Sequence, residues 1–433
     1  MSGLGGAVFR SALAGVVLPV LSMTGAAAQE IPYQPLSAPT PGAAVCPGGL
    51  CQPEALGSFF EALAATEAGL PDRPVHILQL GDSHTAGDRI TGKMRAVLQG
   101  RFGDGGRGVL APGVPHAGYS PMQVEVTATD WRIEPAPLTY PGFEPFPVGL
   151  TNVWTIETGA DSRLAIRPDG PLEATEIRLC WEEPWGVILS DEDETWVLEP
   201  ERQGWWLSCG GVRPATAPGE LVARPVDMDR PLVKLDHIRL TRRRPGVMVS
   251  NLGMVGATLA DLAARTEEVV IDELAEWRPE LIILAYGTNE GFDEGLDPMA
   301  YEGLLRGQIE RLRLRAPDAA LMILGAPDAL RNGIADGCSA DRLRAPPPSL
   351  AVVRDVQGRV AAEMGVAVWD WHGRMGGDCS ADRLALMADP YVRGDRVHFT
   401  SAGADWIGGM LAHDLMAAYD AWKADRAPTG SAD

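Results

Sequence analysis

The chain lacks an excess of positive charge. Its 433 residues include 37 Lys and Arg against 58 Asp and Glu, which gives a formal net charge of −21. Nucleic acids and anionic membrane surfaces repel such a protein, so neither is expected as its main partner. The charge places no limit on a neutral or sugar-like substrate. With 45% hydrophobic and 22% charged residues, the composition is that of a globular protein long enough for two or three domains.

Motifs for a resident metal or nucleotide are also missing. No C-x-x-C pair and no other His, Cys and carboxylate cluster has the spacing of zinc ligands. The sequence contains no G-x-x-x-x-G-K-[ST] phosphate loop and no internal repeat. We therefore expect neither a metal nor a cofactor.

Long hydrophobic runs are absent beyond the first segment. Arg10 is followed by an apolar stretch, 11–24, and by small residues at 26–28, a pattern that predicts a cleaved signal peptide over 1–28. Pro19 interrupts the apolar stretch, which is too short for a stable membrane span; an uncleaved anchor is the alternative. The mature protein is expected to be exported and soluble.

Six cysteines agree with export, because disulfides persist in oxidising compartments. Their spacing suggests three local pairs, with free buried thiols as the alternative. The suggested pairs are Cys46–Cys51, Cys180–Cys209 and Cys338–Cys379.

A buried strand followed at once by a helix stands near the start of the mature chain. After a Pro-, Ala- and Gly-rich linker at 29–54, an amphipathic helix is predicted from Glu54 to Gly69. A strand at 75–80 then ends in Gly-Asp-Ser at Ser83, and a helix follows at 88–101. A serine at such a turn is either a nucleophile beside helix N–H groups or a helix cap.

The segment 124–245 has a different pattern. Helical periodicity disappears and short strands alternate with turn residues, which indicates an inserted β-sandwich. The glycine-rich stretch 102–113 before it is either a wall of the active site or a surface loop. Seven of the twelve tryptophans fall in the insert, where exposed rings could stack on sugars and buried rings would fill the core. They are Trp131, Trp154, Trp181, Trp185, Trp196, Trp205 and Trp206.

From residue 246 strands and helices alternate again. Strands are predicted at 247–253, 281–287, 321–327 and 366–371, and helices at 258–276, 299–314, 350–364 and 401–422. Continuous apolar strands between helices indicate a parallel sheet covered on both faces. The predicted architecture is therefore one α/β domain, residues 55–123 and 246–425, interrupted by the insert and followed by a tail at 426–433.

Polar residues follow three of the predicted strands, and Asp395 and His398 lie ahead of the last helix. These four segments converge on the edge where parallel strands place active sites. His398 can act as base for Ser83, and Asp395 can hold the imidazole tautomer. Backbone N–H groups of Ser83 and Gly256 and the Asn289 amide can bind an oxyanion, each worth about 3–4 kcal/mol. Taken singly, the Asp–His pair could be a surface contact and Asn289 a strand-end cap; their combination favours catalysis.

His84 follows the nucleophile. Helix capping or solvent exposure is its default interpretation, and a place in the pocket wall is the alternative.

These blocks resemble the SGNH (GDSL) hydrolases. The resemblance lies in Gly81-Asp82-Ser83, in Gly256 of NLGMVGAT, in Gly-x-Asn ending at Asn289 and in Asp-x-x-His from Asp395 to His398. It implies a flavodoxin-like α/β/α fold and metal-free ester hydrolysis. Two positions depart from the usual pattern: Ala257 follows the second-block glycine, and His84 replaces a leucine.

A narrower similarity is to the periplasmic peptidoglycan O-acetylesterases of Gram-negative bacteria. It lies in GDSHTAGD, FGDGGRG, AYGTNE and the inserted Trp-rich segment. That similarity implies removal of acetyl from the muramic acid 6-hydroxyl by a periplasmic enzyme with a carbohydrate-binding-like β module. Two alternatives remain open. One is an O-acetyltransferase, or an esterase acting on another exported acetylated glycan, and the other is a catalytically silent glycan-binding protein.

Overall fold

The computed structural model describes residue 46 and residues 49–70, 73–116, 118–135, 147–157, 162–169, 175–182, 186–199, 201–204, 206–214, 220–226 and 234–426. The predicted signal peptide, most of the predicted linker and the tail beyond Arg426 lie outside these ranges. All of these described residues belong to one compact unit. Within the described ranges, no helix combines the length and apolar character needed to cross a membrane.

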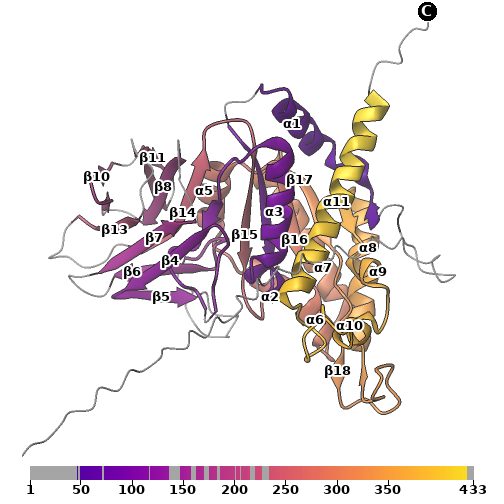
Figure 1. The fold of residues 1–433 in the computed structure, drawn as a ribbon. Coiled ribbons are helices and arrows are strands. Elements are labelled where there is room, and N and C mark those ends of the chain that lie inside the picture. Colours follow the sequence, from indigo (N-terminus) through magenta and orange to yellow (C-terminus); the bar gives the residue numbers. More distant parts are fainter. Residues whose placement is uncertain are drawn as a thin grey trace, which may run out of the picture. The chain divides into compact units, whose positions relative to one another are not determined.

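A six-stranded sheet forms the centre of the α/β domain in the described part of the chain (Figure 1). Its order is β1-β20-β17-β16-β2-β15, with β1 antiparallel and the other strands parallel. Numbered along the chain, the parallel strands run 2-1-3-4-5, which is the flavodoxin-like order. The strands are β1 (Leu50–Cys51), β2 (Val75–Gly81), β15 (Val247–Gly253), β16 (Leu281–Ala285), β17 (Ala320–Leu324) and β20 (Ala367–Trp369).

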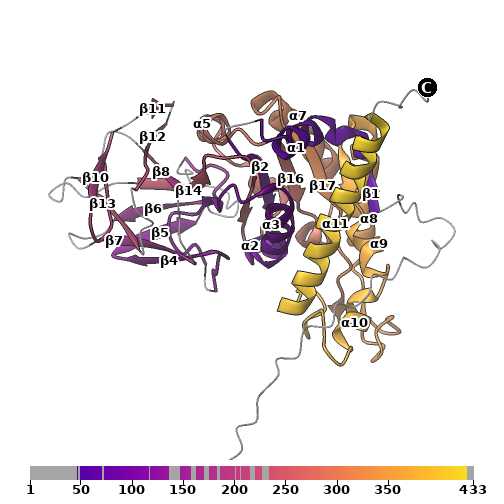
Figure 2. The ribbon, with the colours of Figure 1, turned by 45° about the horizontal axis from the view of Figure 1, so that its top comes forward.

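Helices cover both faces of this sheet, because side chains alternate between faces along each strand. In β2, Ile77 belongs to the core beneath α1, α3 and α11, whereas Leu78 and Leu80 belong to the core beneath α4, α5, α7 and α8. Figure 2 shows these helices around the strands. The predicted three-layer α/β/α fold is confirmed. The helices are α1 (Gly57–Glu67), α3 (Arg89–Phe102), α4 (Leu259–Ala263), α5 (Glu267–Trp277), α7 (Pro298–Arg315), α8 (Pro348–Met364) and α11 (Ser401–Arg426).

Short elements complete the domain around the ends of the strands. They are the 3₁₀ helix η2 (Pro53–Leu56), the helices α2 (Ser83–Ala86), α6 (Thr288–Phe292), α9 (Trp371–Met375) and α10 (Ser380–Ala385), and the paired strands β18 (Arg331–Asn332) and β19 (Arg344–Ala345). Strand β1 lies inside the stretch predicted to be a linker, so the domain begins earlier than the sequence suggests.

The helix predicted over 258–276 is two helices, α4 and α5. A capping box between Thr258 and Asp261 starts α4. At Thr266 the backbone is extended, with φ −63° and ψ 121°. There the Thr266 N–H donates to Val148 O (2.9 Å), and Thr266 Oγ1 accepts from the Val148 N–H (3.1 Å). Contact with the insert therefore replaces the helical hydrogen bond and breaks the helix.

The insert contributes two antiparallel sheets that share one apolar core in the described residues. Trp131 and Trp181 are buried in this core, Trp196 packs against it, and Trp206 is 40% exposed. The remaining tryptophan side chains of the insert lie outside the described set. One sheet has β4 (Val124–Thr129), β7 (Arg163–Pro168), β9 (Val187–Ser190), β10 (Thr195–Leu198) and β13 (Leu221–Pro225), and the other has β3 (Gly108–Leu110), β5 (Trp131–Pro135), β6 (Val153–Glu157), β8 (Thr175–Glu182), β11 (Arg202–Gln203), β12 (Leu207–Val212) and β14 (Lys234–Arg242).

The glycine-rich stretch 102–113 joins the two parts of the chain. Its strand β3 pairs with β14 of the insert, although it lies in the segment predicted to be hydrolase domain. Gly108 has φ +86°, and a Cβ there would overlap Ser250 Oγ. A residue without a side chain is therefore required where β3 approaches β15.

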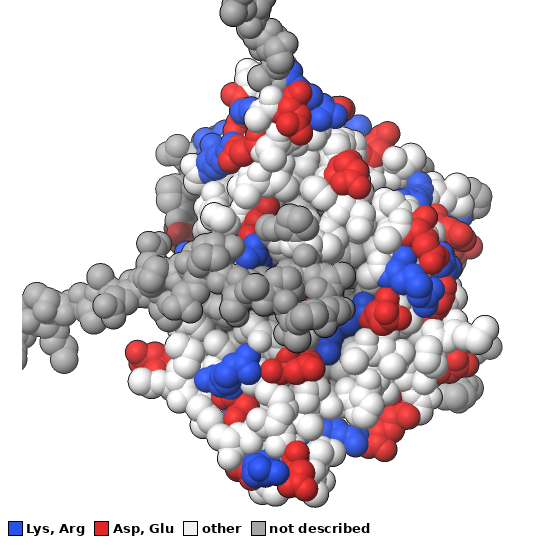
Figure 3. All heavy atoms as spheres, turned by 90° about the vertical axis from the view of Figure 1, so that its right-hand side faces the viewer, with Lys and Arg blue, Asp and Glu red and all other residues white. Residues whose placement is uncertain are grey.

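All six cysteines are paired as the sequence suggested, in Cys46–Cys51, Cys180–Cys209 and Cys338–Cys379. Acidic and basic side chains lie next to one another on the face shown in Figure 3. Among the described ion pairs, for example, Arg359 and Arg306 both pair with Glu302. The net negative charge is therefore not gathered into one patch on this face.

Candidate active site

Three neighbouring strands end at the same level of the sheet. Gly81, the last residue of β2, pairs with Gly253 of β15 on one side and with Ala285 of β16 on the other. The loops that follow these strands carry the three predicted oxyanion donors. Because the strand order reverses between β2 and β16, this edge is where a parallel α/β sheet forms its ligand crevice.

Ser83 is the first residue of α2, directly after the end of β2. Asp82 caps this helix, since its Oδ1 accepts from the His84 N–H (2.9 Å). A Cβ on Gly81 would overlap Thr85 Oγ1 and Ala285 O, so only glycine permits the chain to turn here. Ser83 itself is half-buried.

The structure brings Ser83, His398 and Asp395 into one hydrogen-bonded chain. Ser83 Oγ lies 3.0 Å from His398 Nε2, and His398 Nδ1 lies 2.9 Å from Asp395 Oδ2. The serine and the histidine are 315 positions apart in the sequence. This is the geometry in which an imidazole can take a hydroxyl proton while a carboxylate fixes its tautomer.

The Asp395 carboxylate is held by its own loop. Its Oδ1 accepts from the N–H groups of Val397 (2.9 Å) and His398 (3.0 Å), which leaves Oδ2 for the imidazole. Partial burial raises the pKa of Asp395, but these hydrogen bonds and that from the His398 ring outweigh it, so the pKa lies below its ordinary value. The group is therefore ionised at neutral pH.

Gly256 lies exposed in the loop between β15 and α4, with φ +80°. No heavy atom lies within 4 Å of the position a Cβ would take. The left-handed backbone, rather than a close neighbour in the protein, is what favours glycine at this position. Its backbone therefore remains open to a bound molecule.

Asn289, in the first turn of α6, is tied to the same loop. Its Nδ2 donates to Ala257 O (2.7 Å), one residue beyond Gly256. A side-chain amide nitrogen carries two donors, so a second N–H remains for another acceptor. The half-buried amide and the Gly256 backbone thus belong to one connected rim.

Comparison with known proteins identifies the domain. Residues 236–406 match the model of the GDSL-like Lipase/Acylhydrolase family. Over these residues the chain is similar to the GDSL-like hydrolases. The predicted enzyme class, a carboxylic ester hydrolase of the SGNH type, is confirmed at the level of the family.

Solved structures agree with this fold. A structure of a peptidoglycan O-acetylesterase superposes with a TM-score of 0.73 at 24% identity, covering 86% of this chain and 99% of that one. The lipase/acylhydrolase from Enterococcus faecalis (18% identity, 40% of this chain, 77% of that one) has a TM-score of 0.29. A carbohydrate esterase family 2 enzyme with its carbohydrate-binding domain, from Corynascus thermopiles (Myceliophthora fergusii), has a TM-score of 0.31 at 10% identity, covering 67% and 100%. The two lower scores support no argument. No curated protein sequence matches the chain.

Glu290 links two loops of this GDSL-like site, a role that the sequence did not indicate. Its carboxylate accepts from the Leu259 N–H (2.7 Å) and the Gly287 N–H (3.0 Å), which joins α4 to α6. Burial raises its pKa to about 7 despite these hydrogen bonds. Because Asn289 is the neighbouring residue, Glu290 fixes the helix that presents the amide.

A buried ion network lies behind the nucleophile turn. Asp88 Oδ1 accepts from Arg95 (2.8 Å), and its Oδ2 accepts from Arg107 (2.8 Å) and from the Met122 N–H (2.8 Å). Arg107 also donates to Asn251 Oδ1 (2.8 Å), whose own amide donates to Thr85 O (3.0 Å). The glycine-rich stretch thus supports α2 through Arg107. The sequence alone had left the role of this stretch open.

His84 is buried, against its default interpretation as a cap or an exposed residue. Its Nδ1 lies 3.2 Å from Asp82 Oδ1 and its Nε2 lies 3.1 Å from Val397 O. The imidazole therefore bridges the turn that carries Ser83 and the loop that carries Asp395 and His398. Sequence reasoning could not place it, since Val397 is 313 positions away.

Two groups of described side chains have donor atoms close enough together to hold a metal ion: Asp236, His237 and Glu273, and Asp328, His372 and Asp378. In the first group, both ring nitrogens of His237 already have partners. One contacts Asp236 (2.7 Å), and the other accepts from the Trp277 indole (2.9 Å). Neither group contains a triad residue.

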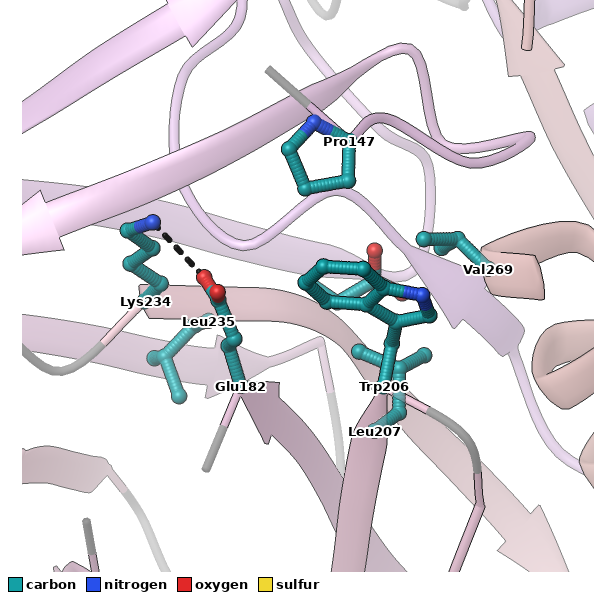
Figure 4. A pocket seen from close by; sticks show the side chains of 8 residues that line it. Pro147, Glu182, Trp206, Leu207, Lys234, Leu235 and Val269 are labelled. Carbon is teal, nitrogen blue, oxygen red and sulfur yellow. Dashed lines mark ion pairs between the residues drawn. The ribbon is translucent and has the colours of Figure 1, made fainter. Parts of the chain in front are cut away.

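A surface pocket lies where the insert meets α5 (Figure 4). Trp206 forms one wall, and the ion pair between Lys234 and Glu182 (2.7 Å) forms another. Val269 of α5 lines the side toward the hydrolase domain. The arrangement combines an exposed aromatic face with polar groups, which is the usual composition of a small-ligand site.

Proposed function

We propose that the chain is an exported serine esterase that removes O-acetyl groups from a glycan. The observation that carries this proposal is the hydrogen-bonded chain from Ser83 through His398 to Asp395. It stands at the switch point of a GDSL-like hydrolase fold, beside the N-terminus of α2.

In the first half-reaction, Ser83 Oγ attacks the acetyl carbonyl carbon and His398 Nε2 takes the hydroxyl proton. The negative charge that develops on the carbonyl oxygen is stabilised by the Ser83 and Gly256 N–H groups and by Asn289 Nδ2. Collapse of this intermediate breaks the bond from the carbonyl carbon to the sugar oxygen. The imidazolium returns its proton to that oxygen, which leaves a free sugar hydroxyl and an acetyl ester on Ser83.

In the second half-reaction, water replaces the sugar. His398 takes a proton from water as the water oxygen attacks the acetyl carbon, and collapse releases acetate and restores the Ser83 hydroxyl. The ionised Asp395 keeps the other ring proton on Nδ1 and stabilises the imidazolium in both steps. If a sugar hydroxyl replaced water here, the same residues would perform O-acetyl transfer.

Peptidoglycan carrying 6-O-acetyl muramic acid is the substrate we propose. The support is the likeness in fold, over 86% of the chain, to a peptidoglycan O-acetylesterase. Three disulfides favour an oxidising compartment, and together with the predicted signal peptide they support a periplasmic location. The acidic chain also suits a substrate other than nucleic acid or an anionic membrane.

The β insert is proposed to bind the glycan away from the reacting ester. Trp206 offers an exposed ring face for a sugar, and the adjacent Lys234–Glu182 pair offers a donor and acceptors for hydroxyl groups. This role would add affinity for polymer without changing the chemical step.

Release of acetate from O-acetylated peptidoglycan tests the proposal. The wild-type protein is expected to release acetate, and Ser83→Ala is expected to lose the activity although it folds. Acetate release by Ser83→Ala would contradict the proposed mechanism. Adding soluble glycans as acceptors separates hydrolysis from transfer, since a transferase would form acetylated acceptor in place of acetate.

A further inference from the structure

The His84 ring contacts two groups that can only accept hydrogen bonds. The Asp82 carboxylate lies 3.2 Å from Nδ1, and the Val397 carbonyl oxygen lies 3.1 Å from Nε2. A neutral imidazole has one N–H and one lone pair, so it would set a lone pair against an oxygen at one of these contacts. An imidazolium satisfies both. The geometry therefore favours the charged ring, even though the side chain is only 3% exposed.

Another buried histidine, His76, provides an internal comparison. His76 contacts Trp277 O (3.2 Å) and Ser250 Oγ (2.7 Å), with no carboxylate on its ring, and burial lowers its pKa to about 3. For His84 burial again lowers the pKa, but the charge and hydrogen bond of Asp82, with the bond to Val397, outweigh it and the pKa is raised. At the same degree of burial the pKa of His76 is lowered and that of His84 is raised, because only the His84 ring has a carboxylate beside it.

The titratable groups that face His84 come from two elements. The turn before α2 supplies Asp82, and the Asp395–Phe399 loop supplies Asp395 and His398. The other rings packed on His84 carry no charge: Trp371 of α9 lies edge-on at 5.3 Å, and Phe399 lies at 5.9 Å.

Glu290 of α6 also acts on this group of charges, through its electrostatic interaction with Asp82. The His84 and His398 rings are stacked, with centroids 5.5 Å apart and planes inclined by 30°.

We propose that His84 is a positioning residue that remains an imidazolium, ties the Asp395–Phe399 loop to the nucleophile turn and opposes protonation of His398. The inference rests on the proposed esterase function for its kinetic consequence, but its structural part does not. A positive charge stacked on the general base disfavours a second positive charge there. His398 therefore keeps its lone pair for the Ser83 proton at a lower pH than it would beside a neutral residue.

His84→Gln removes the positive charge and keeps an amide donor. It therefore separates the effect of the charge from the effect of the hydrogen bond to the Asp395–Phe399 loop. The acid limb of the kcat/KM profile for p-nitrophenyl acetate is expected to move to higher pH by about half a unit or more, from Coulomb's law at this separation. His84→Leu, which restores the residue usual in this block, loses the tether as well and is expected to lower the kcat plateau further. His413→Gln is the matched control, because its 67% exposed ring also lies beside a carboxylate, Asp414.

An acid limb of His84→Gln that stays in place, or moves to lower pH, would overturn the proposal. Nitrogen-15 spectra of the histidine rings give a second readout that needs no turnover. Between pH 6 and 7 the His84 nitrogens of the wild type are expected at imidazolium shifts, with His76 as the neutral reference. Neutral shifts for His84 would refute its charge even if the protein proved to have no esterase activity. If wild type is inactive while His84 is charged, the proposed function fails and the structural inference stands.

Discussion

Asn289 Nδ2 donates to Ala257 O at 2.7 Å, and this hydrogen bond joins the helix after β16 to the loop after β15. It sets the distance between two of the proposed oxyanion donors without involving the substrate. Glu290 reinforces the link by accepting N–H groups from both sides. The oxyanion site is therefore preorganised by contacts between loops, which is the condition under which such donors are most effective.

Replacing Asn289 with Ala removes one donor and this link together. We expect kcat on an acetyl ester to fall by about 10²–10³-fold while KM changes little, because the donor acts mainly on the charge of the transition state. Steady-state kinetics on p-nitrophenyl acetate would measure it. Glu294→Ala, on the exposed loop after α6, serves as the control. A larger rise in KM than fall in kcat would show that Asn289 binds the ground state instead.

Asp395→Asn is expected to lower kcat by about 10²–10⁴-fold by reversing the imidazole tautomer. Two backbone N–H groups hold Oδ1, so the amide oxygen of asparagine will occupy that position. The NH₂ group then faces His398 Nδ1, which must accept, and the ring proton moves to Nε2. An imidazole protonated at Nε2 cannot take the Ser83 proton.

The measurement for Asp395→Asn is kcat with the same ester, and the control is Asp405→Asn in α11. Asp405 pairs with Arg89 on the surface and takes no part in the triad. Activity of Asp395→Asn near the wild-type level would mean that the carboxylate does not set the tautomer.

The sequence predicted the strands that are continuous apolar runs. Strands β2, β16 and β17 appear close to their predicted ends, because residues buried on both faces are marked by composition alone. Strand β1 was missed because two residues beside glycine and proline carry no periodic signal. The break at Thr266 was missed because its partner, Val148, comes from the insert, 118 positions away.

The proposed site likewise contains residues that the sequence predicted and residues that it did not. Ser83, Asn289 and His398 were predicted because each lies next to a recognisable element and has a chemical type suited to a role. His84 and Arg107 were not assigned roles, since burial and the distant partners Val397 and Asp88 decide what they do. Local pattern therefore indicates the reacting groups, and only the fold reveals the groups that hold them.

Acid should lower the free energy of unfolding by protonating Asp88. Burial raises the pKa of this carboxyl, but Arg107 and Arg95 outweigh it and hold the pKa below the ordinary value of 3.8. A carboxyl with a lowered pKa contributes stability above its unfolded pKa, and that contribution is lost as pH falls through the folded pKa. We therefore expect a loss of unfolding free energy below about pH 4 that depends on Asp88.

Asp88→Asn tests this directly. At pH 7 it should cost about 3–5 kcal/mol, because Arg95 and Arg107 remain buried without their carboxylate. Urea unfolding from pH 3 to pH 7 should show the gap from wild type narrowing toward acid. Asp405→Asn, which breaks the exposed pair with Arg89, should cost at most about 1 kcal/mol. A gap for Asp88→Asn that is independent of pH would contradict the linkage.

Trp206→Ala separates glycan binding from chemistry. The indole is exposed and stands beside the Lys234–Glu182 pair in the pocket between the insert and α5 (Figure 4). Loss of the ring should weaken binding to polymeric peptidoglycan by about three- to tenfold, the equivalent of one stacking contact. Sedimentation with insoluble peptidoglycan measures this, and kcat/KM on p-nitrophenyl acetate should not change.

Two further variants serve as controls. Trp206→Phe should recover most of the binding, and Val197→Ala, at a 54% exposed apolar position on β10, should have no effect. Equal binding by Trp206→Ala and wild type would remove this pocket from the proposed glycan path, because Trp206 is the one aromatic side chain among the described residues that line it.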